Sequence, residues 1–191
     1  LGEGGRGTGY EQGVQDDIDV YFATFAKSMA GIGAFLAGNK DVIQYLQYNM
    51  RSQTFAKSLP MAMVKGALKR LDMLRTMPEL KEKLWANTNG LQSGLRAAGF
   101  DLGTTQTCIT PVFLKGEIPE AMAMVNDLRE NHGIFCSIVV YPVIPKGLII
   151  LRLIPTATHT KEDIDETITA FSAIRKLLEN GTYKKIAASI V

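Results

Sequence analysis

The stretch VYFATFAKSMAGIGAFLAG, residues 20–38, carries one charged side chain, that of Lys27. The segment IDVYFAT, residues 18–24, overlaps the beginning of this stretch and is apolar, β-branched and aromatic, which predicts a buried β-strand. A membrane span is excluded, because a central lysine costs about 2.5–3.5 kcal/mol on insertion into a bilayer. The stretch therefore predicts a strand of an α/β fold whose end leads directly to a lysine.

The composition is that of a globular chain of one or two domains. Of the 191 residues 46% are hydrophobic, and 21 Lys+Arg against 19 Asp+Glu leave a net charge of +2. This balance excludes a disordered chain and a nucleic-acid-binding surface, which needs a basic stripe. Two cysteines are too few for a disulfide framework. We expect a cytoplasmic protein, because no secretory signal pattern is present.

Apolar spacing, capping residues and the positions of Pro and Gly predict the elements that follow. Asn39 and Thr160 are the predicted N-caps of two helices, and Asp163 completes a capping box with Thr160. The predicted helices cover residues 40–48, 61–74, 78–98, 119–131 and 161–178, and the predicted strands cover residues 53–56, 108–114, 134–140 and 147–154.

This order of elements divides the chain into three predicted segments. Residues 1–55 read as the end of a larger α/β unit, residues 56–98 as connecting helices, and residues 99–191 as a smaller αβ domain. Leu1 opens a glycine-rich run without a start methionine. We therefore expect the chain to be a piece of a longer protein.

Lys27 is the first candidate for chemistry. The simpler interpretation is a surface lysine whose apolar stem lies along the protein. The alternative follows from its position after a buried strand, where open α/β sheets place ligands. A desolvated lysine there would supply a neutral amine for Schiff-base formation. Thr24 could donate its hydroxyl to a phosphate.

Arg152 is the second candidate, because it interrupts the otherwise aliphatic predicted strand LIILRLI, residues 148–154. It could form a structural salt bridge, or face solvent from an edge strand. Alternatively its planar guanidinium could bind a carboxylate. An imine-forming lysine, a hydroxyl for phosphate and an arginine for carboxylate together suggest pyridoxal phosphate acting on an amino acid.

At these residues the sequence resembles the C-terminal half of the α-oxoamine synthases, which are pyridoxal-phosphate enzymes that condense an amino acid with an acyl-CoA. The match runs almost end to end. The motifs that carry it are GRGT (residues 5–8), TFAK (24–27), FAKSLP (55–60), YPVIPKG (141–147), Arg152 and ATHT (157–160). The resemblance implies the aspartate aminotransferase-like fold type I, with the end of the large domain followed by the small domain.

The resemblance also implies roles for individual residues. Lys27 would hold pyridoxal phosphate covalently and act as general base, Thr24 and Ser58 would bind the cofactor, and Arg152 would bind the substrate carboxylate. Ala56 departs from the Ser or Thr usual in the family, which leaves Ser58 as the phosphate candidate of that segment. A homodimer with a shared active site is the family expectation.

The resemblance leaves the substrates open. The motifs LWAN (residues 84–87) and YPVIPKG favour a glycine C-acetyltransferase, whereas residues 24–35 lean towards serine palmitoyltransferases. An 8-amino-7-oxononanoate synthase is a third member to consider. We favour glycine as the amino acid. The family's aspartate and histidine partners of the cofactor lie outside this chain, so we expect the chain alone to be inactive.

Two alternatives come from other classes. The chain could be a dimerisation or interaction module without activity. It could also bind a metal through His132, Cys136 and His159, but no fourth ligand suggests itself and Cys136 lies in an apolar strand. We predict no metal site.

Overall fold

The computed structural model describes residues 2–190, with side chains up to Ala188. Leu1 and Val191, which belong to the predicted segments 1–55 and 99–191, lie outside the described residues. The chain forms two units, residues 1–78 and 79–191. Their boundary falls inside the predicted connecting segment 56–98, and the three-part division itself stays a prediction. Within residues 2–190 no helix combines the length and the apolar character needed to cross a membrane.

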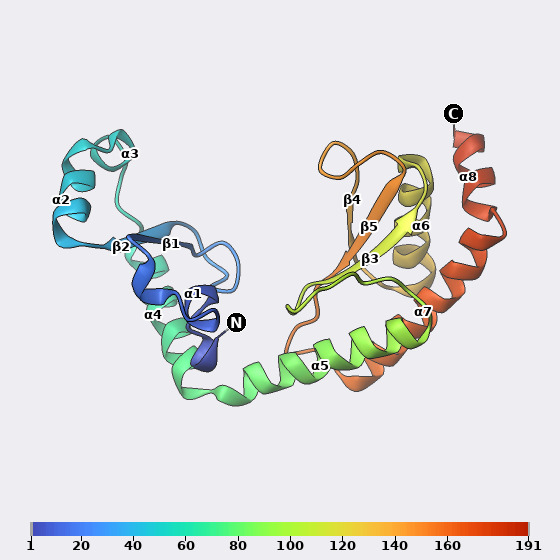
Figure 1. Ribbon diagram of the computed structural model, residues 1–191, viewed down its shortest axis with the longest axis horizontal. Helices are drawn as coiled ribbons and strands as arrows, with labels where there is room; N and C mark the ends of the chain where they lie inside the picture. Colours follow the sequence, from blue (N-terminus) through green and yellow to red (C-terminus); the bar gives the residue numbers. More distant parts are fainter. Residues whose placement is uncertain (1, 191) are drawn as a thin grey trace. The chain divides into compact units, whose positions relative to one another are not determined.

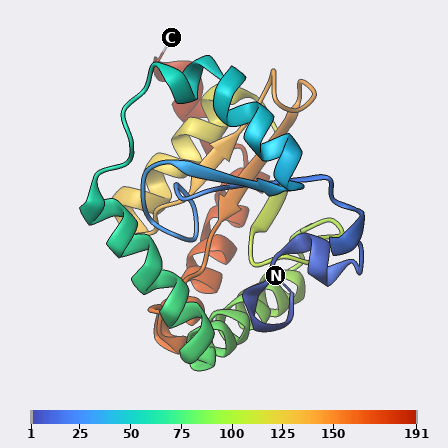
Figure 2. The same cartoon turned by 90° about the vertical axis from the view of Figure 1, so that its left-hand side faces the viewer.

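The first unit is built around an antiparallel hairpin (Figures 1 and 2). Strand β1, Val20–Thr24, pairs with β2, Ala34–Gly38, and Thr24 lies opposite Ala34 at the end where the connecting loop begins. Three short helical segments precede the hairpin: η1, Glu3–Gly5; α1, Thr8–Glu11; and η2, Gln15–Asp17. The loop between the two strands carries Lys27.

Three helices follow the hairpin: α2, Lys40–Asn49; α3, Arg51–Thr54; and α4, Met61–Thr76. The predicted cap of the first is confirmed, because Asn39 Oδ1 accepts a hydrogen bond from the Asp41 amide at 2.9 Å. The predicted strand over residues 53–56 is wrong. The Met50 carbonyl accepts hydrogen bonds from the amides of Gln53 and Thr54, so one helical turn pairs these groups locally and no partner strand is needed.

The prediction that β1 is buried is also wrong within the described residues. Phe22 in its middle is 63% exposed, and Val20 is 41% exposed. The apolar sequence allows burial but does not supply the second layer that a sheet face needs. In residues 2–78 the hairpin is a two-stranded sheet with an uncovered face, so β-branched and aromatic residues remain on its surface.

The second unit is a three-stranded antiparallel sheet covered by helices. Its strand order is β3, Thr110–Lys115; β5, Leu148–Leu153; and β4, Ser137–Val139. Its helices are α5, Pro78–Ala97; α6, Ile118–His132; α7, Lys161–Glu179; and α8, Thr182–Ile190. The predictions of four helices and three strands in residues 61–178 are confirmed to within a few residues at their ends.

The hydrophobic core of the described residues lies in this second unit. Alternate residues of β5 point into it, as the period of a strand requires. Helices α5, α6, α7 and α8 contribute buried side chains as well, and so do β3 and the connecting segments. Those fully shielded from solvent include Leu95, Val112, Met124, Leu128, Ile149, Leu151 and Phe171.

Helix ends in the second unit follow their sequence signals. Thr160 and Asp163 form the predicted capping box, and the hydrogen bonds from the Thr160 amide and hydroxyl hold the pKa of Asp163 below its usual value. Gly133 ends α6 with a φ of 67°, a conformation that favours glycine. Helix α8 was not predicted, although Tyr183, Ile186 and Ala187 have helical spacing.

Tyr183 connects α8 to α6 by a hydrogen bond. Its ring is 1% exposed, and its hydroxyl donates a hydrogen bond to Asp127 at 2.5 Å. Burial, and then the contact with Asp127, raise the pKa of Tyr183. Partial burial acts to raise the pKa of Asp127 as well, but hydrogen bonds from Asn131 and Tyr183 outweigh it and leave this pKa below its usual value.

We expect Tyr183→Phe to lower the free energy of unfolding by about 1–2 kcal/mol at pH 7, because it removes a hydrogen bond to a charged group. The contribution from Asp127 is present above the pKa of the unfolded carboxyl, 3.8, and is lost as the pH falls through the lower folded value. The difference in the free energy of unfolding between wild type and variant should therefore be smaller at acidic pH. Urea unfolding at pH 7 and near pH 3 measures it, and an equal difference at both values would contradict this account.

Candidate functional site

Lys27 stands in a tightly bonded loop at the end of the hairpin. The Ala30 amide donates to the Lys27 carbonyl at 2.9 Å, and the Gly31 amide donates to the Phe25 carbonyl at 2.7 Å. Ala30 has a φ of 41°, which is strained for a residue with a β-carbon. Such strain is found at ligand-binding loops, where surrounding contacts hold the backbone in place.

The side chain of Lys27 is exposed, and its ammonium group makes no hydrogen bond or ion pair among the described residues. Within residues 2–190, Lys27 is thus the surface lysine of the simpler interpretation, and the desolvated alternative is not found. The loop projects from a two-stranded sheet, which cannot enclose it. What the hairpin does provide is an accessible primary amine on a backbone fixed by its own hydrogen bonds.

Thr24 comes directly before this loop, but its hydroxyl is used locally. It donates to the Gly33 carbonyl at 3.3 Å and accepts from the Ala26 amide at 3.1 Å. Because a hydroxyl has one hydrogen to donate, binding a phosphate through Thr24 would require it to give up the long bond to Gly33.

A cavity of about 1180 Å³ lies beside the loop, within the first unit. Thr24 and Ser28, on either side of Lys27 in sequence, line it, whereas Lys27 itself does not. Arg6 and Arg75 line it as well. The Arg6 guanidinium lies 4.7 Å from the centre of the Tyr10 ring. Apolar residues of α4 form the remaining wall, including Val64, Ala67, Leu68 and Leu71. The cavity thus combines anion-binding side chains with an apolar surface.

The glycine-rich segment approaches this cavity closely. Gly7 has a φ of 101°, and a β-carbon there would lie 2.8 Å from the Tyr21 hydroxyl. Only glycine fits without displacing the strand residue. Backbone conformation and close packing therefore explain why the third residue of the GRGT motif, Gly7, is a glycine.

Ser58 lies in the exposed segment of residues 55–60. It does not line the cavity, whereas its neighbour Leu59 does. Its predicted contact with a cofactor phosphate stays a prediction.

Arg152 lies on the central strand β5 and belongs to the second unit. Its side chain is exposed, while its neighbours Leu151 and Leu153 are buried. Arg152 thus faces solvent, as one alternative expected, but from a central strand and not from an edge strand. No ion pair of Arg152 is found among the described residues. Its Nε instead donates a hydrogen bond to Ser137 Oγ at 3.0 Å. Ser137 was missed in the sequence, because only strand pairing brings residues 137 and 152 together.

The turn before α7 is held by Asn87. Its side-chain amide donates to the carbonyls of Thr156 and His159 at 3.0 and 2.8 Å. His159 Nδ1 in turn accepts from the Thr156 amide at 3.1 Å. The ATHT and LWAN motifs thus meet in a structural contact.

The three residues considered for a metal do not form a ligand set. His132 and His159 line a hollow of about 290 Å³ that Cys136 does not reach. Burial raises the pKa of the Cys136 thiol to about 11, so it is protonated at neutral pH. No group of three His, Cys, Asp or Glu side chains in residues 2–190 is placed to hold a metal ion.

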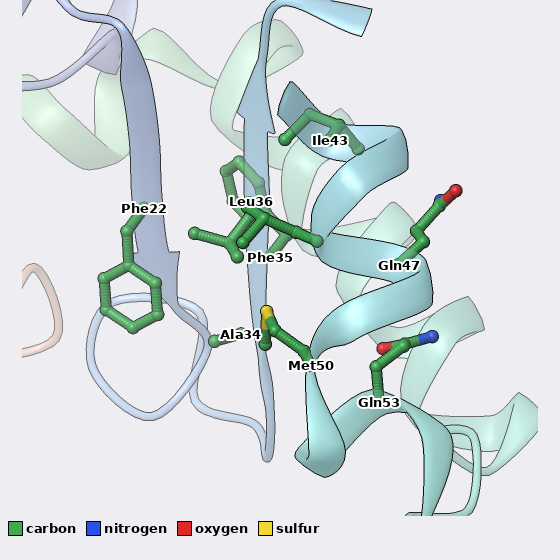
Figure 3. A pocket seen from close by; sticks show the side chains of 9 residues that line it. Phe22, Ala34, Phe35, Leu36, Ile43, Gln47, Met50 and Gln53 are labelled. Carbon is green, nitrogen blue, oxygen red and sulfur yellow. The ribbon is translucent and has the colours of Figure 1, made fainter. Parts of the chain in front are cut away.

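A second hollow of about 360 Å³ in the first unit lies between the hairpin and helices α2 and α3 (Figure 3). Phe22 and Leu36 lie on one face of the hairpin and line it together with Ile43 and Met50 of the helices, and Gln47 and Gln53 stand at its side. Phe35 also borders it, but its ring lies on the opposite face of the hairpin, against Tyr21 and Phe25. None of its lining residues titrates, so it offers an apolar surface and no acid–base group. The cavity beside the Lys27 loop, in contrast to this hollow, brings together hydroxyl and guanidinium side chains suited to cofactor chemistry.

Comparison with known proteins places this geometry in a family. The family profile "Aminotransferase class I and II" matches residues 3–171. A cysteate-C-fatty acyltransferase of Capnocytophaga ochracea is 70% identical over 190 residues, which are 100% of this chain and 45% of the relative. A serine palmitoyltransferase of Sphingobacterium spiritivorum is 38% identical over 94% of this chain and 44% of its own length.

Solved structures agree with these relatives. A serine palmitoyltransferase determined with a pyridoxal phosphate internal aldimine is 32% identical and has a TM-score of 0.83, over 91% of this chain and 44% of that one. The present chain thus spans about 45% of the length of the relatives it matches. The resemblance and the aminotransferase-like fold expected from the sequence are confirmed. The chain belongs to the aminotransferase class I and II family of pyridoxal-phosphate proteins, within its α-oxoamine synthase branch.

Proposed function

We propose that this chain is part of a pyridoxal-phosphate-dependent C-acyltransferase that condenses cysteate with a fatty-acyl thioester. The observation that carries the proposal is the 70% identity, over the whole chain, to a cysteate-C-fatty acyltransferase. Independent support comes from the loop of Lys27: the lysine is exposed, and Thr24 and Ser28 of the same segment line a cavity together with Arg6 and Arg75.

The residues around the loop fit pyridoxal phosphate. The Lys27 amine is free to bond to its aldehyde carbon, and Ser28 and Arg6 offer a hydroxyl and a guanidinium to its phosphate. Thr24 could join them after releasing Gly33, and Ser58 is proposed to reach the cofactor of a partner subunit in a homodimer. When bound, the cofactor supplies an electron sink for the charge left at the substrate Cα.

Two side chains of this chain would carry out the remaining steps of binding and proton transfer. Arg152 would hold the amino-acid carboxylate through its free Nη groups. The Lys27 amine would remove the proton from Cα. The new bond would join Cα to the acyl carbonyl carbon, while the bond from that carbon to sulfur breaks and the thiol leaves.

The relatives favour cysteate over the glycine expected from the sequence. None of their names refers to glycine. The less similar relatives support two other substrates: serine, or the amino acid used by an 8-amino-7-oxononanoate synthase. Cysteate carries a sulfonate as well as a carboxylate.

A chimera tests the proposal. The matched 45% of the Capnocytophaga ochracea relative is replaced by this chain, which aligns with it over 190 residues. We expect thiol release from palmitoyl-CoA that depends on cysteate and exceeds the release with glycine or serine. A folded, cofactor-loaded chimera that prefers glycine would overturn the substrate proposal. One that releases no thiol with any amino acid would favour a non-catalytic interaction module.

In the same chimera, Arg152→Ala should raise the KM for cysteate by about 100-fold, because two charge-assisted hydrogen bonds to the carboxylate are lost. Arg129→Ala is the matched control. Arg129 is an exposed arginine of α6 that pairs with Glu130, and its removal should change KM by less than about twofold. Initial rates at varied cysteate concentration measure both. Equal effects of the two substitutions would argue against a role of Arg152 in substrate binding.

A further inference from the structure

The guanidinium of Arg152 is held on one side by its neighbour across the sheet. Ser137 in β4 lies directly opposite Arg152 in β5, and the Nε–Oγ distance is 3.0 Å. The residue opposite Arg152 on the other side is Pro111 in β3. Proline has no polar side-chain atom, so Ser137 is the one cross-strand partner of Arg152 that can accept from its side chain.

This bond restricts how Arg152 can meet an anion. A guanidinium binds a carboxylate in two ways, through the edge formed by Nε and one Nη or through the edge formed by both Nη groups. Ser137 uses the Nε hydrogen and so occupies the first edge. Among the described residues the two Nη groups make no hydrogen bond or ion pair, and the Arg152 side chain is exposed.

We infer that Ser137 is a positioning residue that turns the Arg152 guanidinium so that its two Nη groups face the substrate carboxylate. The inference rests on the proposed function for the identity of the anion. The orientation itself rests only on the strand pairing and the hydrogen bond. An arginine side chain has several freely rotating bonds, and a bond at Nε fixes the plane of the fork before the substrate arrives. Part of the ordering cost of binding is thereby removed.

The orientation can be tested on this chain alone, by NMR of the arginine Nε–Hε groups in protein labelled with ¹⁵N-arginine. The Arg152 signal, assigned by its absence in Arg152→Lys, should exchange slowly with water. Ser137→Ala should speed this exchange by about three- to tenfold, the range expected for the loss of one hydrogen bond. Ser137→Thr keeps a hydroxyl and should restore slow exchange. Ser93→Ala, an exposed serine of α5, should leave the signal unchanged.

The consequence for binding is tested in the chimera. Ser137→Ala should raise the KM for cysteate by about three- to tenfold with kcat within about twofold, and Ser137→Thr should restore KM. An unchanged Hε exchange rate in Ser137→Ala would overturn the positioning role whatever the chimera does. If exchange changes as expected but KM does not, the bond orients Arg152 without serving the substrate, and that part of the inference is wrong. If the chimera lacks activity with Ser137 intact, the proposed function fails while the NMR result still decides the orientation.

Discussion

Pyridoxal phosphate followed by borohydride is expected to leave a pyridoxyl group on Lys27 in preference to every other lysine of the chain. Lys27 is exposed on a loop fixed by its own hydrogen bonds. Lys27 itself does not line the cavity of the first unit, but its neighbour Ser28 does, together with Arg6 and Arg75. One charge-assisted hydrogen bond to the phosphate is worth about 1.5–3 kcal/mol. Selectivity for Lys27 should therefore be at least about tenfold. Peptide mapping by mass spectrometry measures it.

Substitution separates a formed site from general lysine reactivity. Lys27→Ala should abolish the selective adduct and leave only low modification spread over other lysines. Lys40→Ala is the matched control, because Lys40 is an equally exposed lysine at the start of α2 in the same unit. It should leave the adduct on Lys27 unchanged. Similar labelling of all lysines in the wild type would show that residues 2–78 do not form a cofactor site by themselves.

Phe171→Ala is expected to lower the free energy of unfolding of the second unit by about 3–5 kcal/mol. Phe171 is 0% exposed and meets Phe100 edge to face, with ring centres 5.7 Å apart. Phe100 is covered in turn by the Arg175 guanidinium, which donates a hydrogen bond to the Ala98 carbonyl at 2.5 Å. Truncation leaves a cavity beneath this stack and removes an aromatic pair. A loss of this size is a large part of a typical domain's stability of about 5–15 kcal/mol.

The single tryptophan, Trp85 in α5, reports on unfolding of this unit by fluorescence during urea titration. Phe22→Ala is the control, since it removes the same side chain from the exposed strand β1, where it is 63% exposed. We expect it to change the unfolding transition seen by Trp85 by less than about 0.5 kcal/mol. A comparable loss in both variants would mean that β1 is buried in solution, contrary to the exposure described above.

Local signals in the sequence predicted most elements of the second unit. Helix caps at Thr160 and the stop at Gly133 act within one turn, so short segments are enough to predict them. The predicted strand over residues 53–56 was wrong because strand formation does not depend on local signals alone. A strand needs a partner from elsewhere in the chain, and residues 53–56 have none.

The candidate site was predictable only as a set of residues. The order of GRGT, TFAK, FAKSLP and Arg152 indicated the family, and the match to the aminotransferase class I and II profile confirmed it. The surroundings of those residues were not predictable. The bond from the Thr24 hydroxyl to Gly33 and the bond from Arg152 to Ser137 join residues 9 and 15 positions apart, brought close by strand pairing. The exposure of Lys27 likewise depends on which segments pack around its loop.

The sequence by itself determined the secondary structure of residues 61–178, the family and the side chains able to do its chemistry. Only the tertiary structure decided which apolar residues are buried and which charged groups are free. The hydrophobic effect acts on surface removed from water, and that area depends on which segments pack together. Phe22 and Phe171 have the same side chain, yet Phe22 lies on a two-stranded sheet and is 63% exposed, whereas Phe171 packs from α7 into the core of the second unit and is 0% exposed. Their different burial follows from those neighbours.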